Sequence, residues 1–126
     1  MKIVKTIFFV LFALMFINAG LDKFINYMPK PNVAEMPADM QAVFNAVVTL
    51  KWLTPLTGLI ELVSGILILF PKTRALGAIM ILPVMIGIIC HNATFMPSGL
   101  LIAGVLFLIN LWIIGDNWKK YQTMVS

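Results

Sequence analysis

The chain has 126 residues and a net charge of +4, and 61% of its residues are hydrophobic while only 11% are charged. Soluble domains carry about 25% charged residues, so the composition excludes an ordinary soluble protein and indicates the bilayer as its solvent. The basic residues stand at the ends of apolar runs and form no tract, which argues against nucleic-acid binding. We expect one membrane domain covering residues 1–126.

The first predicted span covers about residues 3–25. Lys2 and Lys5 precede its apolar core, as basic residues also do in a secretory signal peptide. The candidate cleavage site after Ala19, however, has Ile17 where a small residue is preferred, and the apolar run continues beyond it. We therefore interpret this segment as an uncleaved membrane span.

A longer connection follows over about residues 26–52. Three prolines, Pro29, Pro31 and Pro37, keep its first part irregular. After Pro37, apolar residues recur with the period of one helix face. These residues are Met40, Val43, Phe44, Val47 and Val48. The pattern predicts a short amphipathic helix that caps the bundle or lies in the membrane interface, with a kink near Pro55 where it joins the next span.

Three further spans are predicted over about residues 53–70, 75–95 and 98–115. Their lengths fall within the range of about 17–25 residues that crosses a bilayer. The links between them are short, and consecutive helices with short links pack antiparallel as neighbours. The sequence therefore predicts an all-α fold, a membrane-embedded antiparallel four-helix bundle with the amphipathic helix between its first two spans.

The distribution of basic residues predicts the orientation of the chain. Four spans place Lys2, Lys5, Lys72, Arg74, Lys119 and Lys120 on one side of the membrane, and Lys23, Lys30 and Lys51 on the other. Because basic residues favour the cytoplasm, we expect both termini to be cytoplasmic. Cys90 is the only cysteine, so an internal disulfide is excluded and we expect Cys90 to pack between helices. One histidine and scattered carboxylates match no usual metal-ligand spacing, and no metal site is predicted.

Glu61 lies inside the apolar run LTGLIELVSGILILF. An ionised carboxylate at that depth costs at least ~2.5 kcal/mol unless it is paired or faces water. Its own helix face carries Thr57, and Gly58 and Gly65 flank that face, so that a neighbouring helix can approach closely. Five residues, Gly20, Gly58, Gly65, Gly99 and Ala103, are predicted to serve helix packing in this way.

Depth along the helices indicates which polar residues could meet. At about 1.5 Å per residue, Glu61 lies ~12 Å and Asn18 ~10 Å below the outer boundary, with Asp22 and His91 shallower. The candidate polar pocket in the outer half of the bilayer comprises Glu61, His91, Asn18, Asp22, Lys23 and Thr57. We expect Glu61 to pair with Asn18, His91 or Lys23. The alternative is that these side chains only form hydrogen bonds between helices.

Three stretches carry a family resemblance. They are NAGLDKF at residues 18–24, IELVSGILILF at residues 60–70 and PKTRALGA at residues 71–78. With them the chain resembles the DoxX-like family of small four-helix membrane proteins. The resemblance implies an antiparallel four-helix membrane bundle and an association with oxidoreductases, such as a thiosulfate:quinone oxidoreductase, with oxidative-stress complexes or with assembly and trafficking. It also implies that Gly20, Lys23, Glu61 and Gly65 match recurring features of the family.

Two functions follow as expectations. The first is a non-catalytic subunit or assembly factor of a membrane complex, because no redox cysteines or cofactor ligands accompany the family features. The alternative is a component of a membrane oxidoreductase that binds a quinone or a lipid headgroup in the pocket around Glu61. We predict no catalytic activity of its own and no cofactor, with a quinone or a lipid as the candidate ligands. We also expect a membrane-protein partner or a homo-oligomer, in a bacterial inner membrane.

Overall fold

The computed structural model describes residues 2–29 and 32–125, and within these ranges all regular structure is helical. Lys30 and Pro31 of the predicted irregular connection lie outside the described residues. The α-helices are α1 (Lys2–Ile25), α2 (Ala38–Leu50), α3 (Leu53–Leu69), α4 (Arg74–Phe95), α5 (Leu100–Asp116) and α6 (Trp118–Gln122), with the short 3-10 helices η1 (Val33–Glu35) and η2 (Pro97–Gly99).

Three helical segments are long and apolar enough to cross a membrane. They are Lys2–Ile25, Arg74–Phe95 and Pro97–Asp116. Helix α3 has 17 residues, or ~26 Å at 1.5 Å per residue, slightly less than the ~30 Å of a hydrocarbon core. It passes the same test together with α2, although the two helices are bent by 85° at their break. The protein is an integral membrane protein with an all-α helical bundle, which confirms the predicted fold class.

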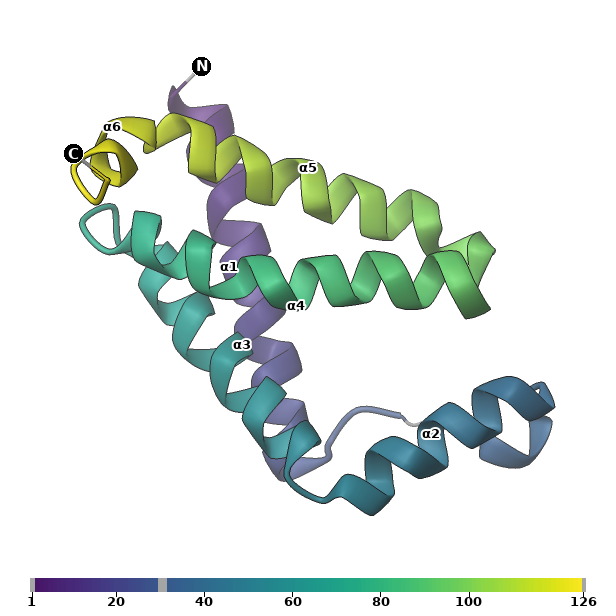
Figure 1. Ribbon diagram of the computed structural model, residues 1–126. Coiled ribbons are helices and arrows are strands. Elements are labelled where there is room, and N and C mark those ends of the chain that lie inside the picture. The colour runs from purple at the N-terminus through teal and green to yellow at the C-terminus, as the bar shows by residue number, and fades with distance from the viewer. Residues whose placement is uncertain (1, 30–31, 126) are drawn as a thin grey trace.

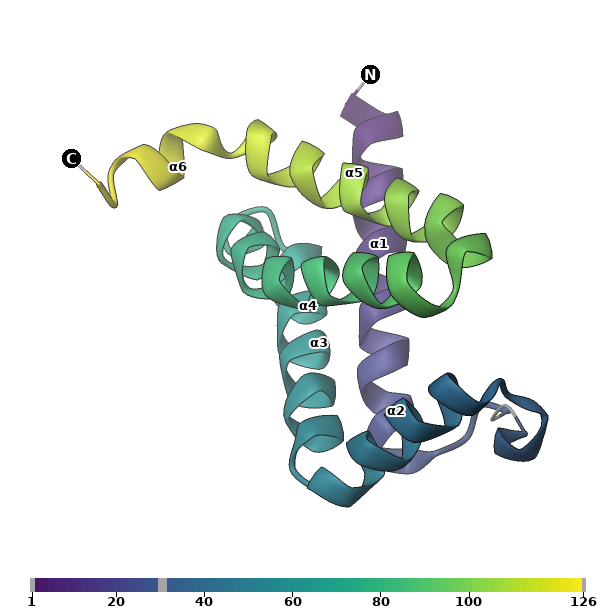
Figure 2. The same ribbon diagram turned by 45° about the vertical axis from the view of Figure 1, so that its right-hand side comes forward.

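Helices α1 and α3 form the first antiparallel pair, and they lie side by side in both views (Figures 1 and 2). Glycines allow their backbones to touch. A Cβ atom added at Gly20 would lie 2.6 Å from the carbonyl oxygen of Gly58, and one at Gly65 would lie 2.8 Å from that of Ala13. Real Cβ atoms do not come so close, so any larger side chain at these positions would push the two helices apart.

Helices α4 and α5 form the second antiparallel pair, which crosses the first pair in both views (Figures 1 and 2). Near the turn that joins α3 to α4, Gly77 packs against the Ser64 carbonyl oxygen and Ile68. Beyond this contact the two helices diverge toward the other end of the hairpin (Figure 1). The hairpin is therefore closed at its turn and open at its far end.

The core lies where the two pairs cross. Its fully or almost fully buried side chains come from α1, α3, α4 and α5, and include Phe9, Phe12, Phe16, Ile68, Ile81, Met85 and Ile113. Asn110 is also fully buried, and its Nδ2 donates to the Ala78 carbonyl 3.1 Å away. This hydrogen bond joins α5 to α4. Cys90 is exposed on α4, so the expectation that it packs between helices is wrong.

Arg74 closes the turn between α3 and α4. Its Nε donates to the carbonyl of Ile68 at 2.8 Å, and its guanidinium carbon lies 5.3 Å from the centre of the Phe9 ring. Arginine thereby satisfies a carbonyl at the end of α3 that has no partner within the helix. The Arg74 side chain is therefore buried and bound to other groups of the protein. Sequence reasoning had counted it only as a positive charge at the membrane boundary.

The break between α2 and α3 falls at Lys51, whose φ is 64°, and not near Pro55 as the sequence indicated. Pro55 lies in the first turn of α3, where its missing N–H has no intrahelical partner to lose, so proline causes no kink there. Helix α2 has no buried residue, and Val48 of its apolar stripe is 58% exposed. Its length and position agree with the predicted amphipathic helix.

Candidate functional site

Glu61 forms an ion pair with Lys23 of α1. The Lys23 Nζ lies 2.7 Å from the Glu61 Oε1, and the two side chains are 30% and 5% exposed. Lys23 is therefore the partner among the three candidates that the sequence left open. A buried carboxylate needs such a countercharge, and the aliphatic stem of lysine can stay in apolar surroundings while its ammonium reaches toward water. The pair joins α1 to α3 beside the contact of Gly20 with Gly58.

Asn18 and Asp22 bind the segment that follows α1. The Tyr27 hydroxyl donates to the Asn18 backbone oxygen at 3.0 Å and to its side-chain oxygen. The Asp22 Oδ1 accepts a hydrogen bond from the Met28 backbone N–H at 2.8 Å. Asn26 has a φ of 58°, a left-handed conformation that asparagine tolerates at the end of a helix. These contacts hold the chain where it folds back after α1. Asn18 and Asp22, both predicted site residues, therefore accept hydrogen bonds from the segment that follows α1.

Thr57 and His91 lie on a different surface. Both line a groove of about 590 Å³ between α3 and α4, in the region where these helices diverge. The Thr57 hydroxyl donates to the Leu53 carbonyl at 2.9 Å. His91 also lines an adjoining hollow of about 370 Å³ against the apolar stripe of α2, and its ring lies 5.4 Å from that of Phe95.

The predicted pocket is thus divided among three places. Glu61 and Lys23 form a pair between α1 and α3, Asn18 and Asp22 order the chain after α1, and Thr57 and His91 line the groove. The first two of these places do not overlap with the cavities, because neither the groove nor the hollow is lined by Glu61, Lys23, Asn18 or Asp22. The cause is the direction of α4. This helix crosses the first pair and does not run alongside it (Figure 2). His91 lines the groove, and Glu61 does not.

The residues predicted to serve packing are also distributed unevenly. Gly20, Gly58 and Gly65 all lie where α1 meets α3. Ala103 is buried on α5. Gly99 instead lies against the side chain of Asn92, within the link between α4 and α5. Gly77, which sequence reasoning did not select, has the same kind of close backbone contact as Gly20. In the sequence, the position of Gly77 shortly after a tight turn was the signal that could have indicated this close contact.

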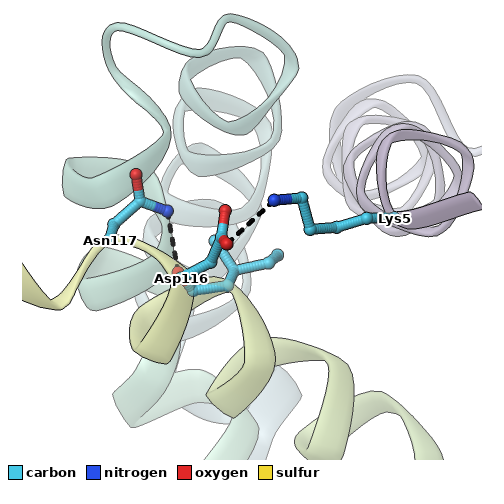
Figure 3. Close-up of polar contacts among 4 residues, drawn as sticks. Lys5, Asp116 and Asn117 are labelled. Carbon is cyan, nitrogen blue, oxygen red and sulfur yellow. Dashed lines mark hydrogen bonds and ion pairs between the residues drawn. The ribbon is translucent and has the colours of Figure 1, made fainter. Parts of the chain in front are cut away.

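The end of the molecule that carries the chain termini holds contacts that sequence reasoning missed. Lys5 of α1 pairs with Asp116 at the end of α5, at 2.9 Å, and Asn117 donates to the Ile113 carbonyl at 2.8 Å (Figure 3). The Tyr121 hydroxyl of α6 donates to the Ala75 carbonyl at 2.6 Å. Burial raises the pKa of the Tyr121 phenol above its usual value. These contacts attach the C-terminal segment to α1 and to the turn between α3 and α4.

Within residues 2–29 and 32–125 no three histidine, cysteine, aspartate or glutamate side chains gather in a group that could hold a metal ion. The polar side chains described above instead form the two ion pairs, bind the segment after α1, and place His91 in the lining of an apolar groove.

Comparison with protein families identifies a match. The model of the DoxX family matches residues 6–93, from the first turn of α1 to the last turn of α4. None of the curated proteins and none of the solved structures matches the chain.

Proposed function

The chain belongs to the DoxX family, and from this premise we propose that it is a non-catalytic subunit or accessory factor of a membrane complex. The observation that carries the proposal is the pairing of Glu61 with Lys23 at 2.7 Å. The acidic residue most suited to chemistry within the spans is held between two helices. Its role is then to fix α1 against α3, and the function of the protein depends on the outer surfaces of the bundle.

Those outer surfaces suit a hydrophobic partner as well as lipid. Helix α5 exposes Leu101, Ile102 and Leu108 at 79%, 68% and 65%. A complex within the membrane would form through such faces. In this proposal the end that carries Lys2, Lys5, Lys72, Arg74, Lys119 and Lys120 faces the cytoplasm of a bacterial cell, because basic residues favour that side.

Native mass spectrometry of gently extracted protein tests the proposal. We expect a membrane protein to co-purify in stable proportion with the wild type. The same partner should remain with Glu61→Gln, because this side chain faces α1 and is only 4% exposed. A monomer that never retains another protein would refute the proposal, as would an enzymatic activity that purified monomer supports alone.

A second candidate function draws support from the groove between α3 and α4. A component of a membrane oxidoreductase could bind a quinone or a lipid headgroup there, with Thr57 and His91 near its polar part. The groove and not the surroundings of Glu61 would be the binding site. If this function is correct, a small molecule stays bound to the wild type during extraction. The amount that stays bound should be lower in His91→Ala. Equal retention in both proteins would remove the reason for this candidate.

A further inference from the structure

We propose that the groove between α3 and α4 is a binding site for an anionic phospholipid, with an acyl chain between the two helices and the phosphate beside His91. The inference deepens the second candidate function, on which it rests for the choice of site, and it names the class of ligand. It does not depend on whether the protein is part of an oxidoreductase.

The walls of the groove become more polar from its closed end to its open end. Ile60, Pro83 and Val84 line the part nearer the turn between α3 and α4, and all three are apolar. His91 and Asn92 line the part near the end of α4. A molecule that fits this arrangement has a long apolar portion and one polar end. Membrane lipids have this form and surround the protein at high concentration.

The polar groups near the open end favour an anion. Neither the groove nor the adjoining hollow is lined by a carboxylate. His91 can donate from its ring, and Asn92 has a second amide hydrogen besides the one used toward the Ile88 carbonyl at 2.8 Å. Lys51 lies two residues before Leu53, which begins α3 and lines the groove, but Lys51 itself lines neither cavity. These donors complement a phosphate group. Because no carboxylate lines either cavity, the ammonium group of a zwitterionic headgroup would find no partner there, so the lining favours an anionic headgroup.

The adjoining hollow extends the site. His91 and Met96 line both cavities, so the two cavities meet at the end of α4. The outer wall of the hollow is the apolar stripe of α2, formed by Met40, Val43, Phe44 and Val47. Helix α2 buries no residue against the rest of the protein. An acyl chain in the hollow would give this stripe an apolar surface to cover.

Gly87 offers a direct way to block the groove. It lines the groove on α4, and a Cβ atom added there would meet no atom within 4 Å. The Cβ atom of a leucine at this position would find open space, and we expect the rest of its side chain to extend into the groove. Gly104 on α5 has the same open surroundings, is likewise helical, and lines neither cavity. Gly104→Leu is thus a matched control for Gly87→Leu.

The test is lipid retention by the full-length protein. Wild type and variants are reconstituted in vesicles of phosphatidylglycerol and phosphatidylcholine in equal amounts, extracted in detergent, and analysed by native mass spectrometry with lipid quantification. We expect wild type and Gly104→Leu to retain phosphatidylglycerol in preference to phosphatidylcholine. Retention should fall about tenfold in Gly87→Leu, which corresponds to the loss of about 1.4 kcal/mol of binding free energy. The thermal stability of each variant, measured in parallel, shows that it is folded.

His91→Leu separates headgroup recognition from chain binding. It introduces an apolar side chain of similar bulk in place of the ring donor, so total lipid retention should persist while the preference for phosphatidylglycerol is lost. Equal retention by Gly87→Leu and Gly104→Leu would overturn the proposal. A quinone, a peptide or a second copy of the chain displaced by Gly87→Leu in place of phospholipid would also overturn it. Because partner recovery is a separate readout, failure here leaves the accessory function standing.

Discussion

The two faces of α3 meet their neighbours in opposite ways. On the face toward α1, Gly20, Gly58 and Gly65 bring two backbones into contact, and a buried ion pair lies between them. On the face toward α4, Gly77 brings the backbones close at the end near the turn, and a groove of about 590 Å³ opens farther along. Each of the two neighbouring helices has a glycine on its side toward α3: Gly20 on α1 has no room for a methyl group, whereas Gly87 on α4 has open space beside it.

This difference teaches that a small residue in a membrane helix has two separate uses. Where helices run alongside each other, it allows the backbones to approach and to gain packing contacts. Where helices diverge, it widens the space between them. Substitutions that add the same side chain at both kinds of position should separate the two uses.

The largest effect is expected when leucine replaces the two glycines in turn. Gly20→Leu forces α1 away from α3, because a Cβ atom there already meets the Gly58 oxygen, and it should lower the free energy of unfolding by ~3 kcal/mol or more. Gly87→Leu should be neutral or stabilising by up to ~1 kcal/mol, since leucine favours a helix over glycine. Unfolding in mixed SDS micelles measures both. Similar losses for the two variants would contradict the comparison.

The ion pair on the α1 face should respond unequally to loss of its two members. Lys23→Met leaves the Glu61 carboxylate buried without a countercharge and should cost ~3 kcal/mol. Glu61→Gln should cost only ~1 kcal/mol, because Lys23 is 30% exposed and can turn toward water. The double variant Lys23→Met with Glu61→Gln should be more stable than Lys23→Met alone. The same unfolding assay compares the three, and a larger cost for Glu61→Gln would reverse this interpretation.

A smaller effect is expected at Asn110, which attaches α5 to α4 through the Ala78 carbonyl. Asn110→Ala removes the bond to the Ala78 carbonyl and leaves a cavity, at a cost of ~2 kcal/mol. Asn110→Leu keeps the volume and also removes a buried side-chain oxygen that has no partner among the described residues, so its cost should be lower. Thermal unfolding of the two variants in detergent ranks them. Equal costs would show that volume is unimportant here.

The smallest effect concerns Tyr121, outside the spans. Tyr121→Phe removes the bond to Ala75 and should cost ~1 kcal/mol at neutral pH. Because burial raises the pKa of this phenol, its contribution is fully present below the unfolded value of ~10 and is lost as pH rises through the folded pKa. The difference in thermal stability between wild type and Tyr121→Phe should therefore shrink above pH ~10. A difference that stays constant to higher pH would contradict the assignment.

Local patterns predicted much of the molecule. The spans appear close to their predicted bounds because a run of apolar residues must be helical in lipid, where each backbone polar group needs a partner inside the chain. The amphipathic helix was visible as an apolar stripe after Pro37. The pairing of Glu61 was expected from the cost of a charge in the membrane, but three partners were equally acceptable by depth alone.

The position of the groove and the exclusion of Glu61 from it could not be predicted. The depth argument assumed four helices that run parallel to one axis, so that residues at one depth would meet. The second pair crosses the first, and equal distance along a helix then no longer means proximity (Figure 2). Similarly, the break at Lys51 depends on a left-handed backbone conformation, for which lysine gives no local signal.

The sequence by itself determined that this protein is an integral membrane protein of helices, that Glu61 requires a partner and that glycines permit close helix contacts. Those conclusions rest on the cost of exposing polar groups to lipid, a local property of each segment. Only the tertiary structure decided that Lys23 is the partner of Glu61, that Thr57 and His91 border a separate groove and that Gly87 opens it. These depend on how whole helices cross, which is set by packing summed over many side chains at once.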